Sequence, residues 1–184
     1  MKAYGTIDDE RLAELVKQGE VEAYAELMER YQPKMEKYIG GILWWSREEV
    51  DDLVSETLVR AYENMRGFRP GWKFSSWIYR IGHNTTVDWL KKQKRNKSWE
   101  VEEDNVAMEE SGEPEAVAVS QEREERVKQL MGKLETKYRE VVWLYYFEDK
   151  SYEEIADILE TTVYNVGVRL KRAKDFLKKY EQEK

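Results

Sequence analysis

The chain has 184 residues, of which 41% are hydrophobic, and it carries a net charge of −7. This length allows one domain or two small ones, and the apolar content suffices for two modest cores rather than one large one. The sequence has no cysteine, which excludes a disulfide framework and a thiolate metal site, and no apolar run approaches the ~20 residues that span a bilayer.

The first ten residues, MKAYGTIDDE, lack the apolar core of a signal peptide, so we expect a cytoplasmic protein. Thr6 and Asp9 have the spacing of a capping box, which predicts a short helix that ends at Gly19. A second helix is expected from Val21, and Pro33 is expected to kink it or restart it.

Ser46 and Glu49 have capping-box spacing and predict the start of a third helix, whose two faces differ in chemistry. The apolar residues at helical spacing, expected to face the core, are Val54, Leu58, Ala61, Tyr62 and Met65. The opposite face carries the acids Asp52 and Glu56. An acidic helix face suits a basic protein surface, because the charges are complementary.

Two glycines and a proline break this helix in a turn that also holds Phe68 and Trp72. The next helix is expected to be capped by Ser75 or Ser76. Its inward face is expected to hold Phe74, Ile78, Ile81, Thr85 and Trp89. Another face carries Arg80, Asn84, Asp88, Lys91 and Arg95. A basic helix with nearby aromatic rings and an amide suits single-stranded or melted nucleic acid, because cations bind phosphates and bases stack on rings.

From Ser98 to Gln121 the helical periodicity disappears. This window contains eight acids and no base, so removing its charge from the net −7 leaves +1 for the rest of the chain. Such a segment cannot offset its ordering entropy by burial, so we interpret it as a linker that is flexible in the free protein.

A second helical region is expected from Glu122. Ser151 and Glu154 have capping-box spacing and predict a short helix, which a three-residue turn at 160–162 ends. The last helix is expected to bury Val163, Val166, Leu170, Ala173 and Leu177. This spacing is typical of a helix-turn-helix unit, and the basic exposed face of the last helix suits a DNA major groove.

Two stretches resemble the extracytoplasmic function (ECF) group of bacterial RNA polymerase sigma factors, in the sigma-70 family. DDLVSETLVRAY with GFRPGWKFSSWIYRIGHNTTVDWLKKQKR resembles sigma domain two, and KYREVVWLYYFEDKSYEEIADILETTVYNVGVRLKRAKDFL resembles sigma domain four. The resemblance implies an all-α fold of two small helical domains. A four-helix promoter-melting domain is expected at residues 6–97, an acidic flexible linker at 98–121 and a helix-turn-helix domain at 122–184.

In this family, domain two binds the β′ clamp helices of the polymerase core and reads the melted −10 element, and domain four reads the double-stranded −35 element and binds the β flap. The resemblance implies that the polymerase-binding residues are Asp51, Asp52, Ser55 and Glu56. The residues implied at single-stranded −10 DNA are Phe68, Arg69, Trp72, Phe74, Arg80, Asn84, Asp88, Lys91 and Arg95. Those implied at −35 DNA are Tyr164, Asn165, Val168, Arg169, Lys171 and Arg172.

The last helix departs from the family pattern at two positions. Gly167 stands where a basic reader is usual, and Val168 stands where a hydroxyl reader is usual. We therefore expect Arg172 and Lys171 to be the main readers of the upstream element, with weaker base discrimination than the family norm.

The resemblance implies a transcription initiation factor that directs core RNA polymerase to promoters and is bound by an anti-sigma factor. It also implies that the protein has no catalytic activity, needs no cofactor or metal and does not insert into a membrane. His83, the only histidine, is expected on the surface or against DNA rather than in a catalytic set. Two alternatives stay open from the residues alone. One is a helix-turn-helix regulator that acts without polymerase, and the other is a helical adaptor whose basic faces keep it soluble.

Overall fold

The computed structural model describes residues 4–43, 47–97 and 130–182, and within these ranges every regular element is helical, which confirms the all-α prediction. The elements are α1 (Asp9–Lys17), α2 (Val21–Leu43), α3 (Arg47–Glu63), the 3-10 turn η1 (Met65–Gly67), α4 (Phe74–Lys97), α6 (Thr136–Tyr146), α7 (Tyr152–Ile158) and α8 (Val163–Gln182). The predicted linker at 98–121 and the predicted cap Ser46 lie outside the described residues.

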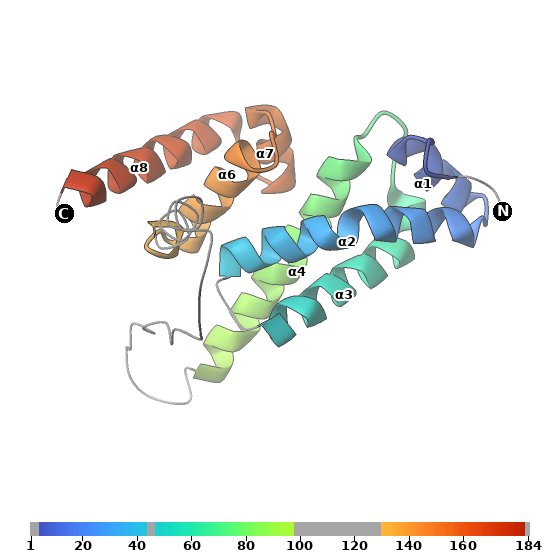
Figure 1. Ribbon diagram of the computed structural model, residues 1–184, viewed down its shortest axis with the longest axis horizontal. Helices are drawn as coiled ribbons and strands as arrows, with labels where there is room; N and C mark the ends of the chain where they lie inside the picture. The colour runs from blue at the N-terminus through green and yellow to red at the C-terminus, as the bar shows by residue number, and fades with distance from the viewer. Residues whose placement is uncertain (1–3, 44–46, 98–129, 183–184) are drawn as a thin grey trace, which may run out of the picture.

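The helices form two groups that pack against each other (Figure 1). The first group is α1–α4, and the second is α6–α8, coloured orange to red, with α6 against α2 and α7 against α4. Buried apolar side chains of both groups belong to one continuous cluster that includes Tyr38, Tyr79 and Leu144. The two cores expected from composition are therefore in contact.

The first two helices differ from the prediction in two respects, the cap of α1 and the effect of Pro33 on α2. The Asp8 carboxylate accepts the backbone N–H of Arg11 at 2.8 Å, so Asp8 caps α1 and the predicted capping box of Thr6 is wrong. Gly19 has φ +98°, a conformation that favours glycine, and α1 ends just before it as predicted. Helix α2 runs through Pro33 without a break, so the predicted restart is wrong.

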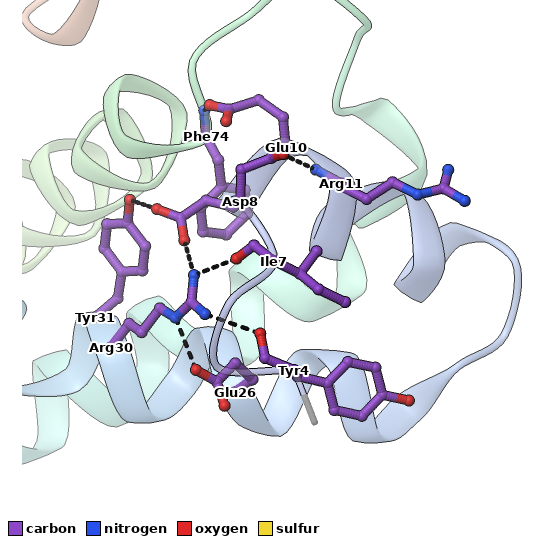
Figure 2. A network of polar contacts seen from close by, with 10 residues as sticks. Tyr4, Ile7, Asp8, Glu10, Arg11, Glu26, Arg30, Tyr31 and Phe74 are labelled. Atoms are coloured by element: carbon purple, nitrogen blue, oxygen red, sulfur yellow. Dashed lines mark hydrogen bonds and ion pairs between the residues drawn. The ribbon is translucent and has the colours of Figure 1, made fainter. Parts of the chain in front are cut away.

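A polar network around Arg30 holds the N-terminal segment against α2 (Figure 2). Its guanidinium donates to the carbonyl oxygens of Ile7 and Tyr4 at 2.8 and 3.1 Å. It also pairs with Asp9 at 2.7 Å and with Glu26 at 2.8 Å. Because these partners come from the segment before α1, from α1 and from α2, the network fixes the position of α1.

Helix α1 in turn positions the start of α4. The Glu10 carboxylate accepts the backbone N–H of Phe74 at 2.9 Å, a favourable place for a negative charge at a helix N-terminus (Figure 2). Lys17 Nζ donates to the carbonyl oxygen of Phe68 at 2.8 Å, in the turn before α4. The predicted cap by Ser75 or Ser76 is wrong, since both residues lie inside the helix.

The second group contains the predicted helix-turn-helix unit. The capping box of Ser151 and Glu154 is confirmed, with its two hydrogen bonds at 3.2 and 2.9 Å. Glu160 has φ +48° in the turn, and Thr162 Oγ1 accepts the N–H of Asn165 at 3.2 Å at the start of α8. Val166, Leu170 and Ala173 are buried as predicted. The prediction for Val163 is wrong, because it lies in the exposed first turn.

Candidate functional site

The outer face of α3 carries the four residues predicted to bind the polymerase. Their side chains, those of Asp51, Asp52, Ser55 and Glu56, are all exposed. The inner face holds α3 in place, because Val54, Leu58 and Ala61 are buried as predicted. The row of acids on α3 is therefore a solvent-facing negative surface on a helix that is rigidly packed from behind.

An open groove of about 870 Å³ lies between α2 and α3, beside the acidic row. Its apolar lining includes side chains that are at least one third exposed, namely Val21, Met28, Val59 and Tyr62. Asp51 and Ser55 also line it, so the groove and the acidic row share residues. The expectation that Tyr62 is buried is wrong, because its ring is 44% exposed in this groove. An exposed apolar groove with acidic edges suits an amphipathic helix of a partner protein.

The aromatic turn before α4 divides into buried and exposed rings. Phe68 and Phe74 were expected to contact the melted −10 strand, and this expectation is wrong, because both rings are buried. They pack on Trp77, with ring centroids 5.4 and 5.5 Å away. They hold the turn in place and present no face to a DNA strand.

Trp72 is the exposed ring of this turn, with 40% of its surface accessible. The guanidinium groups of Arg69 and Arg80 lie 5.5 and 5.6 Å from its ring centroid. A flat ring with two adjacent cations offers stacking to a base and charge to its phosphates. Gly71, with φ +84°, precedes the ring in a backbone conformation that favours glycine.

Further along α4, Asn84 is half-buried, and within the described residues its amide makes no hydrogen bond. Asp88 lies 3.5 Å from Arg60, which also pairs with Glu56 at 2.6 Å. Arg60 therefore joins the acidic row on α3 to the polar face of α4, a link that the sequence analysis missed. The spacing of four residues between Glu56 and Arg60 could have predicted the ion pair between them, because such residues are neighbours on a helix surface. Lys91 and Arg95 are exposed.

Helix α8 carries all six residues predicted at −35 DNA. Tyr164 is 79% exposed, and Asn165, Lys171 and Arg172 are also exposed. Val168 and Arg169 are half-buried. Arg172 Nη1 is 3.5 Å from the hydroxyl of Tyr138, a weak contact that leaves the guanidinium available.

His83 does not lie where the sequence analysis placed it. Its side chain is 15% exposed, and its Nδ1 is 2.8 Å from Glu140 Oε1 in α6. The Tyr38 hydroxyl donates to the same oxygen at 2.6 Å. Burial, together with the negative charge of Glu140, raises the pKa of Tyr38 well above its ordinary value. His83 thus belongs to the contact between the two helix groups, and the expectation of a surface or DNA-facing residue is wrong.

No three His, Asp or Glu side chains in the described ranges gather as a metal site would require. No helix there combines the length and the apolar character needed to cross a membrane.

Each of the two helix groups matches a known protein family. The family described as Sigma-70 region 2 matches residues 27–96, and Sigma-70, region 4 matches residues 124–177. The chain is 32% identical to "ECF RNA polymerase sigma factor SigW" of Bacillus subtilis, over 89% of this chain and 91% of that one. It is 31% identical to "ECF RNA polymerase sigma-E factor" of Haemophilus influenzae, over 93% and 94% of the two chains.

Two solved structures share the fold. CnrH, in complex with the cytosolic domain of CnrY, aligns with a TM-score of 0.70 and 24% identity, over 95% of this chain and 97% of that one. The sigma factor RpoE of Bartonella quintana, in complex with the anti-sigma factor NepR, aligns with a TM-score of 0.69 and 19% identity, over 86% and 96% of the two chains.

Proposed function

The chain belongs to the ECF group of the sigma-70 family, and we propose that it binds core RNA polymerase through the acidic row on α3 and the adjacent groove. It is a transcription initiation factor of this family. The observation that carries the proposal is the exposed row of Asp51, Asp52, Ser55 and Glu56 beside an apolar groove. Acids give charge complementarity to a basic clamp helix, and the groove gives it apolar contact.

The two DNA contacts are assigned to separate helices. The proposed −10 surface consists of Trp72 with Arg69 and Arg80, followed along α4 by Asn84, Asp88, Lys91 and Arg95. The exposed ring of Trp72, with the guanidinium groups of Arg69 and Arg80 beside it, supports this assignment. The proposed −35 surface is the exposed side of α8, with Arg172 and Lys171 as its main readers.

The remaining proposals concern the whole chain. The domain boundaries proposed are 6–97, 98–121 and 122–184, and the protein is proposed to be non-catalytic and to act in the cytoplasm. Core RNA polymerase, through its β′ clamp helices and β flap, and promoter DNA are its proposed partners. An anti-sigma factor is a further proposed partner, because RpoE, which has the same fold, was solved with the anti-sigma factor NepR.

A charge reversal on α3 tests the polymerase contact. Asp52→Lys with Glu56→Lys places like charges against a basic surface and should weaken the complex with core polymerase by ~1–3 kcal/mol. Both side chains are exposed, so the fold should be unchanged by circular dichroism. The affinity is measured by titrating labelled protein with purified core enzyme.

Glu22→Lys with Glu29→Lys is the matched control. It makes the same charge change on exposed positions of α2 that do not line the groove. An α3 variant that binds core polymerase as tightly as this control would exclude the acidic row as the binding surface. A helix-turn-helix regulator that acts without polymerase would show no saturable binding in any form.

A further inference from the structure

The outward face of α8 carries two apolar side chains in its first two turns. Val166, Leu170 and Ala173 are buried and define the inner face of this helix. Tyr164 and Val168 lie on the opposite side, one above the other, because residues four apart share a helix face. The N-terminal residues of the second helix contact base edges when a helix-turn-helix unit binds DNA, so these two side chains lie where bases would be read.

The ring of Tyr164 has no role within the protein that would explain its position. Among the large apolar side chains of the described residues it is the most exposed, at 79%. Within these residues it makes no hydrogen bond and no contact with another ring. The Tyr164 ring therefore contributes little to the packing of the second helix group and is available to a ligand.

Gly167 leaves the surface beside these two side chains open. Residues 164, 167 and 168 are neighbours on one face of the helix. A Cβ added to Gly167 would lie 3.6 Å from the Tyr152 ring and would meet no other side chain. Val168 is half-buried, and its side chain has no polar atom. This part of α8 thus offers two apolar surfaces with a gap beside them, and no hydrogen-bonding group of its own.

The nearest amide is held within the preceding turn. Asn165 Nδ2 donates to Thr161 Oγ1 at 3.2 Å, and the Asn165 backbone N–H donates to Thr162 Oγ1 at 3.2 Å. Since an asparagine reads adenine through both ends of its amide, the contact with Thr161 competes with that reading. The exposed cations Lys171 and Arg172 follow one turn later, where they suit phosphate oxygens and a guanine.

We propose that Tyr164 and Val168 select thymine in the upstream element through contact with its C5-methyl group, near a guanine bound by Arg172. Thymine presents a methyl group in the major groove, and apolar side chains contact it there. Burial of one methyl group corresponds to a preference of about fourfold. Because this is weaker than an arginine–guanine pair, Arg172 sets the register and the two apolar side chains refine the choice of bases. The inference rests on the proposed reading of −35 DNA by α8.

Deoxyuridine gives a direct test, because it pairs as thymidine does and lacks only the methyl group. Selection from randomised duplexes with the full-length protein first gives the preferred upstream sequence. Each thymine of that sequence, on either strand, is then replaced singly by deoxyuridine, and the affinity is measured by fluorescence anisotropy. We expect a loss of about fourfold at one or two positions. At those positions 5-methylcytosine should bind more tightly than cytosine, since its methyl group occupies the same place in the groove.

Two alanine variants assign the methyl contact to its residues. Tyr164→Ala and Val168→Ala should each abolish the difference between thymine and deoxyuridine at one position. Tyr164→Phe is the matched control, because it keeps the ring and should keep the difference. Both alanine variants should fold, as circular dichroism can check, since Tyr164 is largely exposed and alanine favours a helix more than valine does.

Equal binding of thymine and deoxyuridine at every position would overturn the methyl contact. A selected sequence without thymine, or a difference that survives both alanine variants, would also overturn it. Loss of the difference in Tyr164→Phe would overturn the role of the Tyr164 ring. In each of these cases the selected sequence would still support the reading of duplex DNA. If no sequence were enriched from the library, the assignment of α8 to −35 DNA would be wrong, and the methyl contact with it.

Discussion

Two adjacent charged side chains, Arg139 and Glu140, are buried on one turn of α6. Arg139 donates to the carbonyl oxygens of Met131, Gly132 and Leu134, near the start of the second group, and to that of Ile42 in the last turn of α2. Burial lowers the pKa of Arg139 below its ordinary value. One side chain therefore satisfies buried carbonyl groups of both helix groups at once.

Arg139→Met should strongly destabilise the protein, because it leaves these carbonyl groups without their donor. The expected loss in the free energy of unfolding is about 1–3 kcal/mol for each buried carbonyl group left without a donor, measured by urea denaturation. Arg11→Met is the control, since the Arg11–Glu14 pair is about half exposed and should contribute at most about 1 kcal/mol. Equal losses in the two variants would show that the Arg139 contacts carry no particular stability.

Asn84 and Lys91 lie on one helix but should affect DNA binding differently. Asn84→Ala removes an amide that makes no hydrogen bond within the described residues, so it should lower discrimination at one base of the −10 strand. Lys91→Ala should weaken binding to all sequences similarly and reduce the salt dependence. Both are measured by competition among single strands with the polymerase complex. If Asn84→Ala left the base preference unchanged, this result would show that the Asn84 amide does not read a base.

At the scale of elements, α8 carries a glycine that its neighbours do not require. A Cβ on Gly167 would lie 3.6 Å from the Tyr152 ring, an ordinary contact. Gly167→Ala should therefore stabilise the protein by about 1 kcal/mol through helix propensity alone. Thermal unfolding measures the change, and a destabilised variant would show that the glycine is needed for packing.

We also expect position 167 to affect the proposed reading of DNA by α8. Gly167→Lys with Val168→Ser restores the side chains usual in the family and should tighten binding to a typical −35 duplex. Arg172→Ala should remove the existing upstream preference, since an arginine–guanine pair contributes ~1–3 kcal/mol of discrimination. Selection from randomised duplexes with the full-length protein measures both. A sharp preference that survives Arg172→Ala would place the reading face elsewhere.

The start or end of a helix was predictable where residues close to it in the sequence determine it. The capping box of Ser151 and Glu154 and the glycine stop at Gly19 involve residues close in sequence, and both are present. The starts of α1 and α4 were not predictable in this way. Asp8 caps α1 in place of the expected Thr6. Glu10 binds the first N–H of α4 from 64 residues away, a contact that no short spacing indicates.

At the scale of the whole molecule, sequence patterns predicted DNA-contacting residues on α4 and α8 but not how the two helix groups pack against each other. His83 and Glu140 are 57 residues apart, and Tyr38 and Glu140 are 102 apart, so neither pair leaves a periodic signal. The burial of Phe68 and Phe74 likewise depends on α1 and α2 packing around the turn, as the ring contact between Tyr31 and Phe74 at 5.2 Å shows.

Promoter-directed transcription with purified core RNA polymerase tests the central claim most directly. Core enzyme and this protein together, on a promoter library, should give run-off transcripts with defined start sites that neither component gives alone. Asp52→Lys with Glu56→Lys should reduce these transcripts, and Glu22→Lys with Glu29→Lys should not. If the protein bound duplex DNA by itself but never changed which promoters the core enzyme transcribes, the assignment as a transcription initiation factor would be contradicted.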